Sequence, residues 1–152
     1  MTSATPGIRY ADGNVFTIPE MMDLFRRVHP GRVVDDTPEE VGRMFAPHAN
    51  LVATAWAGSL LIGFARGFTD FHIVAYLADL AVDHEWRKRG VGRGLVEHLM
   101  ARLEPGAKMV LLSSPEADGF YQRLGFTSNP RGWIFQQSGH RTINSVPRGG
   151  VS

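Results

Sequence analysis

The sequence predicts a single mixed α/β domain. Apolar segments with strand character alternate with segments of helical periodicity, and neither an internal repeat nor a second apolar core divides the chain. A length of 152 residues is enough to bury one compact core. We expect residues 1–137 to form the domain. The polar, glycine-rich tail at 138–152 is predicted to be disordered.

The first half of the chain contains the signals for a strand, two helices and a hairpin. Pro19 suits the first turn of a helix, and Thr37 followed by Pro38 is typical of a helix start. Two apolar segments flank Ala-Gly-Ser, which is typical of a β-hairpin. The expected elements are a strand at 8–10, a helix at 18–28, a helix starting at 37, and strands at 51–56 and 60–66.

The second half begins with Gly-Phe-Thr-Asp-Phe at 67–71, which we interpret as a turn. Apolar residues recur three or four positions apart from Val91 to Leu103, as in a helix that packs on a core. Gly125 is suited to end a short helix. The expected elements are strands at 73–82, 109–113 and 133–136, and helices at 90–103 and 116–124.

Composition limits the classes of function. The net charge is +1, so the chain as a whole is not a polyanion binder. It has no cysteine, and its six histidines lack metal-ligand spacing, so we expect no metal site and no thiol nucleophile. No apolar segment approaches the roughly 20 residues that span a bilayer, and no signal peptide is evident. We therefore expect a cytoplasmic protein without membrane association.

The segment Glu-Trp-Arg-Lys-Arg-Gly-Val-Gly-Arg-Gly-Leu at 85–95 is unusual for a helix start. A helix N-terminus carries partial positive charge, yet this one is rich in cations and glycine. Free N–H groups, glycine and basic side chains together favour an anion such as pyrophosphate. The segment matches neither a P-loop nor a dinucleotide-binding fingerprint. The alternatives are an ordinary basic surface loop or a patch that binds nucleic acid.

Arg-Lys-Arg-Gly-Val-Gly at 87–92 resembles the Q/R-x-x-G-x-G/A signature of the GNAT superfamily of N-acetyltransferases. "LADLAVDHEWR" resembles that superfamily's central strand, and "SSPEADGFYQRLGF" resembles its second signature. The resemblance covers residues 8–136 and implies a mostly antiparallel sheet, splayed at the cofactor strand and flanked by about four helices. It implies acetyl-CoA as co-substrate, with pantetheine along Leu80, Ala81 and Val82. The implied pyrophosphate site comprises Arg87, Lys88, Arg89, Gly90, Val91, Gly92, Arg93 and Gly94.

The resemblance also implies a role for Tyr121, as the residue that hydrogen-bonds the thioester sulfur; otherwise it is a core aromatic. Tyrosine has a pKa near 10 and a thiol one near 8.5, so full proton transfer from tyrosine to a thiolate is uphill by about 2 kcal/mol. Hydrogen bonding therefore contributes as much as proton donation. Ser114 stands where the family often has Asn or Asp; a serine can still bind coenzyme A.

A general base is expected because an alkylamine is neutral only about once in 2,500 molecules at pH 7. Asp79 lies beside the predicted cofactor strand edge and is our candidate for that base. Other interpretations are that it contacts the substrate ammonium, or that it merely ends a strand. His72, His84 and Glu85 are further candidates, and water relays are equally compatible.

The sequence therefore predicts an acetyl-CoA-dependent N-acetyltransferase in which a primary amine attacks the thioester directly. "GFARGFTD" and "RLGFTSNPRGW" resemble the branch that includes plant serotonin N-acetyltransferases, which favours a small arylalkylamine. Protein lysine, a peptide amine or an amino sugar are alternative acceptors. A non-catalytic acyl-CoA sensor is an alternative of another class. We expect no metal and no nucleic-acid partner, and a monomer or homodimer.

Overall fold

The computed structural model describes residues 7–28 and 37–139. Its five strands form one sheet in the order β1-β2-β3-β4-β5. Successive strands are antiparallel except for β4 and β5, which are parallel. The strands are β1 (Ile8–Asp12), β2 (Leu51–Ala57), β3 (Leu60–Thr69), β4 (Val74–Val82) and β5 (Lys108–Leu111). The predicted fold class, a mixed sheet with four helices, is confirmed.

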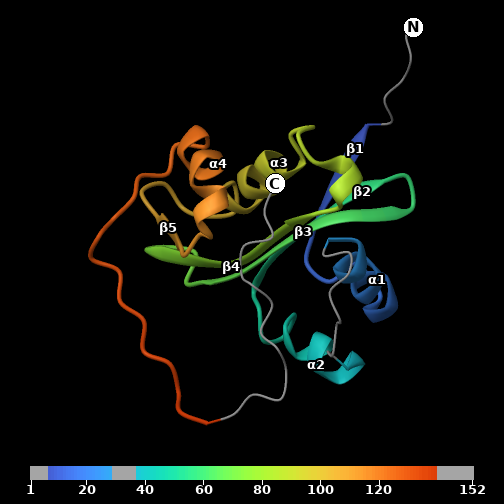
Figure 1. Ribbon diagram of the computed structural model, residues 1–152, viewed down its shortest axis with the longest axis horizontal. Coiled ribbons are helices and arrows are strands. Elements are labelled where there is room, and N and C mark those ends of the chain that lie inside the picture. Colours follow the sequence, from blue (N-terminus) through green and yellow to red (C-terminus); the bar gives the residue numbers. More distant parts are fainter. Residues whose placement is uncertain (1–6, 29–36, 140–152) are drawn as a thin grey trace, which may run out of the picture.

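The helices cover both faces of the sheet (Figure 1). They are α1 (Ile18–Val28), α2 (Pro38–Arg43), α3 (Val91–Met100) and α4 (Asp118–Arg123), with 3₁₀ turns η1 (His84–Trp86) and η2 (Pro115–Ala117). Helices α3 and α4 lie on one face, and α1 and α2 lie on the other. Each face has its own apolar cluster, one centred on Ile62, Leu80 and Leu95 and the other on Met21, Phe45 and Phe64.

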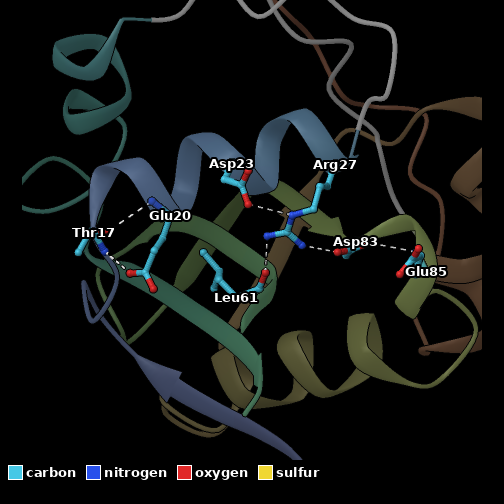
Figure 2. A network of polar contacts seen from close by, with 7 residues as sticks. All are labelled: Thr17, Glu20, Asp23, Arg27, Leu61, Asp83 and Glu85. Atoms are coloured by element: carbon cyan, nitrogen blue, oxygen red, sulfur yellow. Dashed lines mark hydrogen bonds and ion pairs between the residues drawn. The ribbon is translucent and has the colours of Figure 1, made fainter. Parts of the chain in front are cut away.

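Local signals place the helix starts well. Helix α1 has the predicted bounds, and a capping box closes its first turn: Glu20 N–H donates to Thr17 Oγ1 at 3.2 Å, and Thr17 N–H donates to Glu20 Oε1 at 2.8 Å. Figure 2 shows this pair at the start of α1. The predicted cap at Thr37 is confirmed, since its hydroxyl accepts from Glu40 N–H at 3.2 Å. Both starts satisfy N–H groups that a helix leaves free.

Two predictions about strands are wrong. Strand β3 continues through Gly67–Thr69, and the turn comes later, where the Asp70 carboxylate accepts hydrogen bonds from the next backbone N–H groups. The expected strand at 133–136 does not form: Trp133, Ile134 and Phe135 are 93%, 73% and 94% exposed. An apolar pattern favours a strand, but a strand also requires a partner edge, which a local pattern cannot supply. The predicted disordered tail lies, from residue 140, outside the described residues.

Candidate active site

Strand β4 contains a bulge near its middle. Arg66 of β3 pairs with Asp79, but the next residue, Gly67, pairs with Leu77, so Ala78 is an extra residue in β4. Pairing of β4 with β5 ends at Leu77. Bulges bend the strand that carries them. Strand β5 ends at Leu111, opposite Leu77, so among the described strands none pairs with this side of β4 from Ala78 to Val82. We call this side the open edge of β4.

Main-chain groups of β4 line this open edge. The N–H of Asp83 donates to Ile62 O on β3 at 2.7 Å. Because backbone direction alternates along an antiparallel pair, the N–H groups of Val82 and Leu80 point away from β3 and toward the open edge. The N–H of Ala81 points to β3. Of the three residues predicted to bind pantetheine, Leu80 and Val82 therefore direct their N–H groups to the open edge, and Ala81 is buried in the core.

The start of α3 presents unsatisfied N–H groups, as the sequence predicts. Gly90 is the N-cap in a left-handed conformation (φ 82°), which glycine adopts without steric cost, and it has no side chain to cap the helix. The first N–H groups of a helix have no partner within the helix. Here these belong to Val91, Gly92 and Arg93. Lys88 is also left-handed (φ 63°), a conformation that costs a side-chain-bearing residue about 1–2 kcal/mol.

These donors face a pocket of about 240 Å³ between the start of α3 and helix α4. Basic side chains enter it from three segments, the loop, α3 and α4. Its lining comprises Lys88, Gly90, Val91, Gly92, Arg93, Phe120, Arg123 and Leu124. Positive side chains beside free helix N–H groups form a site for an anion. Arg123 was missed by sequence reasoning. It lies two residues after Tyr121, and only the packing of α4 against the loop brings it here.

Two of the predicted phosphate ligands are used elsewhere. Arg87 donates to main-chain oxygens, from Nε to Val82 O at 3.4 Å and from Nη2 to Val28 O at 3.5 Å, and does not line the pocket. Arg89 stacks over the ring of Trp86, with 4.9 Å from its Cζ to the ring centroid. The Arg87 guanidinium thus links the loop to the end of α1. The contact with Trp86 holds the Arg89 side chain against η1.

Close packing explains why position 94 is a glycine. A Cβ at Gly94 would lie 2.1 Å from the Tyr10 hydroxyl oxygen. Glycine here lets α3 approach β1 closely, and the residue does not line the pocket.

We expect Gly94→Ala to lower the free energy of unfolding by about 1–3 kcal/mol, the usual cost of overpacking, without changing the Kd for CoA. Chemical denaturation and calorimetric titration measure the two quantities. Gly42→Ala is the matched control, because its Cβ would meet only Ile18 at 3.9 Å. A loss of CoA affinity in folded Gly94→Ala protein would instead support the prediction that Gly94 contacts the cofactor.

Ser114 contributes to a turn. Its hydroxyl hydrogen-bonds the carboxylate of Glu116, and the pKa of Glu116 is lowered, first by the backbone N–H of Glu116 and then by this hydroxyl. Ser114 is the N-cap residue of η2 and does not line the pocket. The structure therefore gives Ser114 a local role ahead of α4, which differs from the predicted contact with coenzyme A.

Tyr121 is buried in α4 between two aromatic rings. Its ring makes edge contacts with Phe120 and Phe126, at centroid distances of 5.1 and 5.5 Å. Burial and, to a smaller extent, the charge of Asp79 together raise the pKa of Tyr121 to about 12. The two predicted catalytic residues thus lie within electrostatic reach of each other. The raised pKa makes the phenol a persistent hydrogen-bond donor.

Asp79 is held by an arginine that sequence reasoning did not consider. Its Oδ2 accepts from Arg66 Nε at 2.6 Å and Nη2 at 2.5 Å, and the side chains are 12% and 11% exposed respectively. Arg66 also donates to Met44 O at 3.2 Å. The guanidinium offsets the charge of this largely buried carboxylate, which would otherwise be costly to remove from water. The pair could be found only from the β3–β4 register, because its members are 13 positions apart.

Comparison with known proteins identifies the family. A model described as an acetyltransferase (GNAT) domain matches residues 48–128, more than half of the chain. The chain belongs to the GNAT acetyltransferase family. GCN5-related N-acetyltransferase 2, chloroplastic, from Arabidopsis thaliana is 36% identical over 74 residues, which are 47% of this chain and 29% of that protein. The chain thus spans under a third of that relative's length.

Solved structures share the fold. An aminoglycoside N-acetyltransferase in complex with CoA superposes with a TM-score of 0.67 at 18% identity, covering 90% of this chain and 99% of the other. Glucosamine-6-phosphate N-acetyltransferase from Arabidopsis thaliana gives 0.60 at 18% identity, covering 88% and 98%. The narrower likeness to serotonin N-acetyltransferases is not confirmed, because the curated relatives are of GCN5-related and ycf52 types.

Neither a spanning helix nor a metal cluster is found in the part of the chain that the structure describes. Its helices are too short or too polar to cross a bilayer. Its His, Asp and Glu residues do not gather in groups of three that could hold a metal ion.

Proposed function

We propose that the protein is an acetyl-CoA-dependent N-acetyltransferase. The observation that carries the proposal is that three features adjoin one apolar cluster: the start of α3 with its basic pocket, the open edge of β4 and the buried Tyr121. Lys88, Arg93 and Arg123 would hold the phosphates together with the free N–H groups of α3. Leu80 and Val82 would hydrogen-bond the pantetheine chain.

Acetyl-CoA supplies an acyl group already activated as a thioester. Main-chain and side-chain groups of the protein then assist direct transfer of this acyl group to an amine. Main-chain N–H groups at the open edge of β4 polarise the carbonyl, because fixed donors stabilise the negative charge that develops on its oxygen. Tyr121 donates a hydrogen bond to the departing sulfur. The sequence has no cysteine, so a cysteinyl acyl-enzyme is excluded.

Asp79 would orient the incoming ammonium and accept its proton directly or through water. The Arg66 guanidinium already occupies one carboxylate oxygen, so the amine must approach the other or displace the arginine. This arrangement favours proton release through water, because the bound guanidinium hinders direct contact between the amine and the carboxylate.

A small arylalkylamine is the acceptor we propose. Phe68 and Tyr76 are directly opposed on β3 and β4, and each is 39% exposed. Arg66 lies over the Phe68 ring, with 5.5 Å from its Cζ to the ring centroid, so this aromatic surface adjoins Asp79. An arylalkylamine would cover the rings and present its cationic head to the carboxylate. Burying a ring contributes about 25 cal/mol per Å² of apolar area.

We expect tryptamine-like and phenethylamine-like amines to give higher kcat/KM than amino-sugar phosphates in a panel that reads thiol release. Asp79→Asn should lower kcat/KM about 10²-fold at pH 7 and recover in part as rising pH deprotonates the free amine. A pH–rate profile of both forms measures this.

Asp12→Asn is the control, because Asp12 pairs with His98 on the other side of the domain. Preference for a sugar phosphate or a lysine peptide would remove the arylalkylamine assignment. A profile for Asp79→Asn parallel to wild type at every pH would remove Asp79 from proton transfer. Neither outcome affects the acetyltransferase assignment, which fails in this assay if no amine stimulates thiol release.

A further inference from the structure

Asp83 is a buried charge that the proposed chemistry does not use. It is 5% exposed, and within the described ranges the other buried polar side chain is the uncharged Thr54. A buried carboxylate is costly unless it is paired and hydrogen-bonded. Asp83 is the residue between β4 and η1, immediately before the loop that leads to the phosphate pocket. Its partners therefore bear on how that loop is held.

Both carboxylate oxygens of Asp83 have partners (Figure 2). Oδ1 accepts from Glu85 N–H at 3.0 Å, which caps η1. Oδ2 forms an ion pair with Nη1 of Arg27, in the last turn of α1. The other guanidinium nitrogens of Arg27 bind Leu61 O at 2.9 Å and Asp23 Oδ2 at 3.2 Å. One arginine thus joins α1, β3 and the start of the loop.

The loop needs such an anchor because its conformation is costly. Lys88 and Gly90 are both left-handed, and only the second is a glycine. Strained backbone persists where the surrounding structure fixes it on both sides. Helix α3 fixes the far side. Asp83 fixes the near side through Arg27, and Arg87 adds a second link to the end of α1 through Val28 O.

We propose that Asp83 and Arg27 are positioning residues for the phosphate-binding loop, an inference that rests on the proposed CoA site. Neither residue lines the pocket, so the pair acts by setting the position of Lys88 and of the free N–H groups of α3. Loss of the pair weakens binding of the phosphates and leaves the groups around Tyr121 and Asp79 in place. The pair therefore controls cofactor affinity rather than the chemical step.

The test is calorimetric titration of the full chain with CoA. Asp83→Asn keeps an oxygen to cap η1 but removes the charge that pairs with Arg27. We expect its Kd to rise about tenfold, since small displacements of binding groups carry penalties of this size or more. With any accepted amine, the KM for acetyl-CoA rises and kcat stays near the wild-type value. Arg27→Gln should match Asp83→Asn, and the double variant should add little further loss.

Asp23→Asn is the matched control. Asp23 also pairs with Arg27 but is 60% exposed and does not touch the loop. The Asp23→Asn variant should therefore bind CoA with the wild-type Kd. Arg27→Lys keeps the charge toward Asp83 and should recover part of the affinity; it also serves if Asp83→Asn does not fold. Variants that lose thermal stability but bind CoA like wild type would overturn the inference. Failure of the wild type itself to bind CoA would instead reject the proposed function.

Discussion

Replacing Tyr121 with phenylalanine is expected to lower kcat by about 10²–10⁴-fold, the usual contribution of a group that assists proton movement in a transition state. Phenylalanine keeps the edge contacts with Phe120 and Phe126, so the packing of α4 is preserved. The hydroxyl would act only as the sulfur departs, so the Kd for CoA should change little. Steady-state kinetics and calorimetric titration separate the two quantities.

The raised pKa of Tyr121 determines how the hydroxyl works. With a pKa of about 12, the phenol lies about 3.5 units above a thiol, and passing its proton to a thiolate would be uphill by about 5 kcal/mol. We therefore expect Tyr121 to donate a hydrogen bond and keep its proton. The folded-state pKa is raised above the unfolded value of 10, so this burial contributes stability that is present below pH 10 and is lost as pH rises through about 12.

Tyr10→Phe is the control for this prediction, because it removes another partly buried hydroxyl, on β1, whose pKa burial also raises. Its kcat should be unchanged. Normal turnover by Tyr121→Phe would reduce Tyr121 to a core aromatic. If kcat falls at high pH in the wild type and falls in the same way in Tyr121→Phe, the ionisation responsible belongs to another group.

The fold could be predicted largely from local signals. Helix α1 and the start of α3 fall where capping residues, Pro19 and Gly90 place them, because these signals act within one turn. The strand expected at 133–136 fails for the opposite reason, since pairing depends on an edge elsewhere in the chain. The bulge at Ala78 arises from the β3–β4 register, which local signals do not give. Glycine at 67 fits this bulge, because a Cβ there would lie 2.5 Å from Tyr76 O.

The site was predictable as a region but not contact by contact. The concentration of cations and glycine at 87–94 predicts an anion-binding helix start, and the structure has a pocket with basic side chains there. It does not reveal which cations face the anion, since Arg87 turns to the main chain and Arg123 arrives from α4. Similarly, Asp79 is placed on the correct strand, but its arginine partner follows from strand register alone. Charge density along a sequence predicts where a binding surface lies. Which of its side chains point to the ligand can be read only from the packed structure.

Replacing Gly92 with aspartate is expected to abolish the stabilisation that acetyl-CoA gives the wild type. Gly92 lies in the first turn of α3 and lines the pocket. At about 100 times its Kd, a ligand adds about 2.7 kcal/mol. This corresponds to a rise in Tm of about 5–10 °C for a chain of 152 residues. The new carboxylate would lie where the phosphates bind and repel them. Differential scanning fluorimetry with and without acetyl-CoA measures the change.

The charge of the substitution can be separated from its size. Aspartate near a helix N-terminus interacts favourably with the helix dipole, so Gly92→Asp should not lose its folded state for electrostatic reasons. Gly92→Asn has nearly the same volume without the charge, and it should retain part of the ligand-induced rise. Equal loss in both variants would mean that the pocket excludes side chains by size alone. An undiminished rise in Gly92→Asp would place the phosphates elsewhere, and no rise in the wild type would remove acetyl-CoA as the co-substrate.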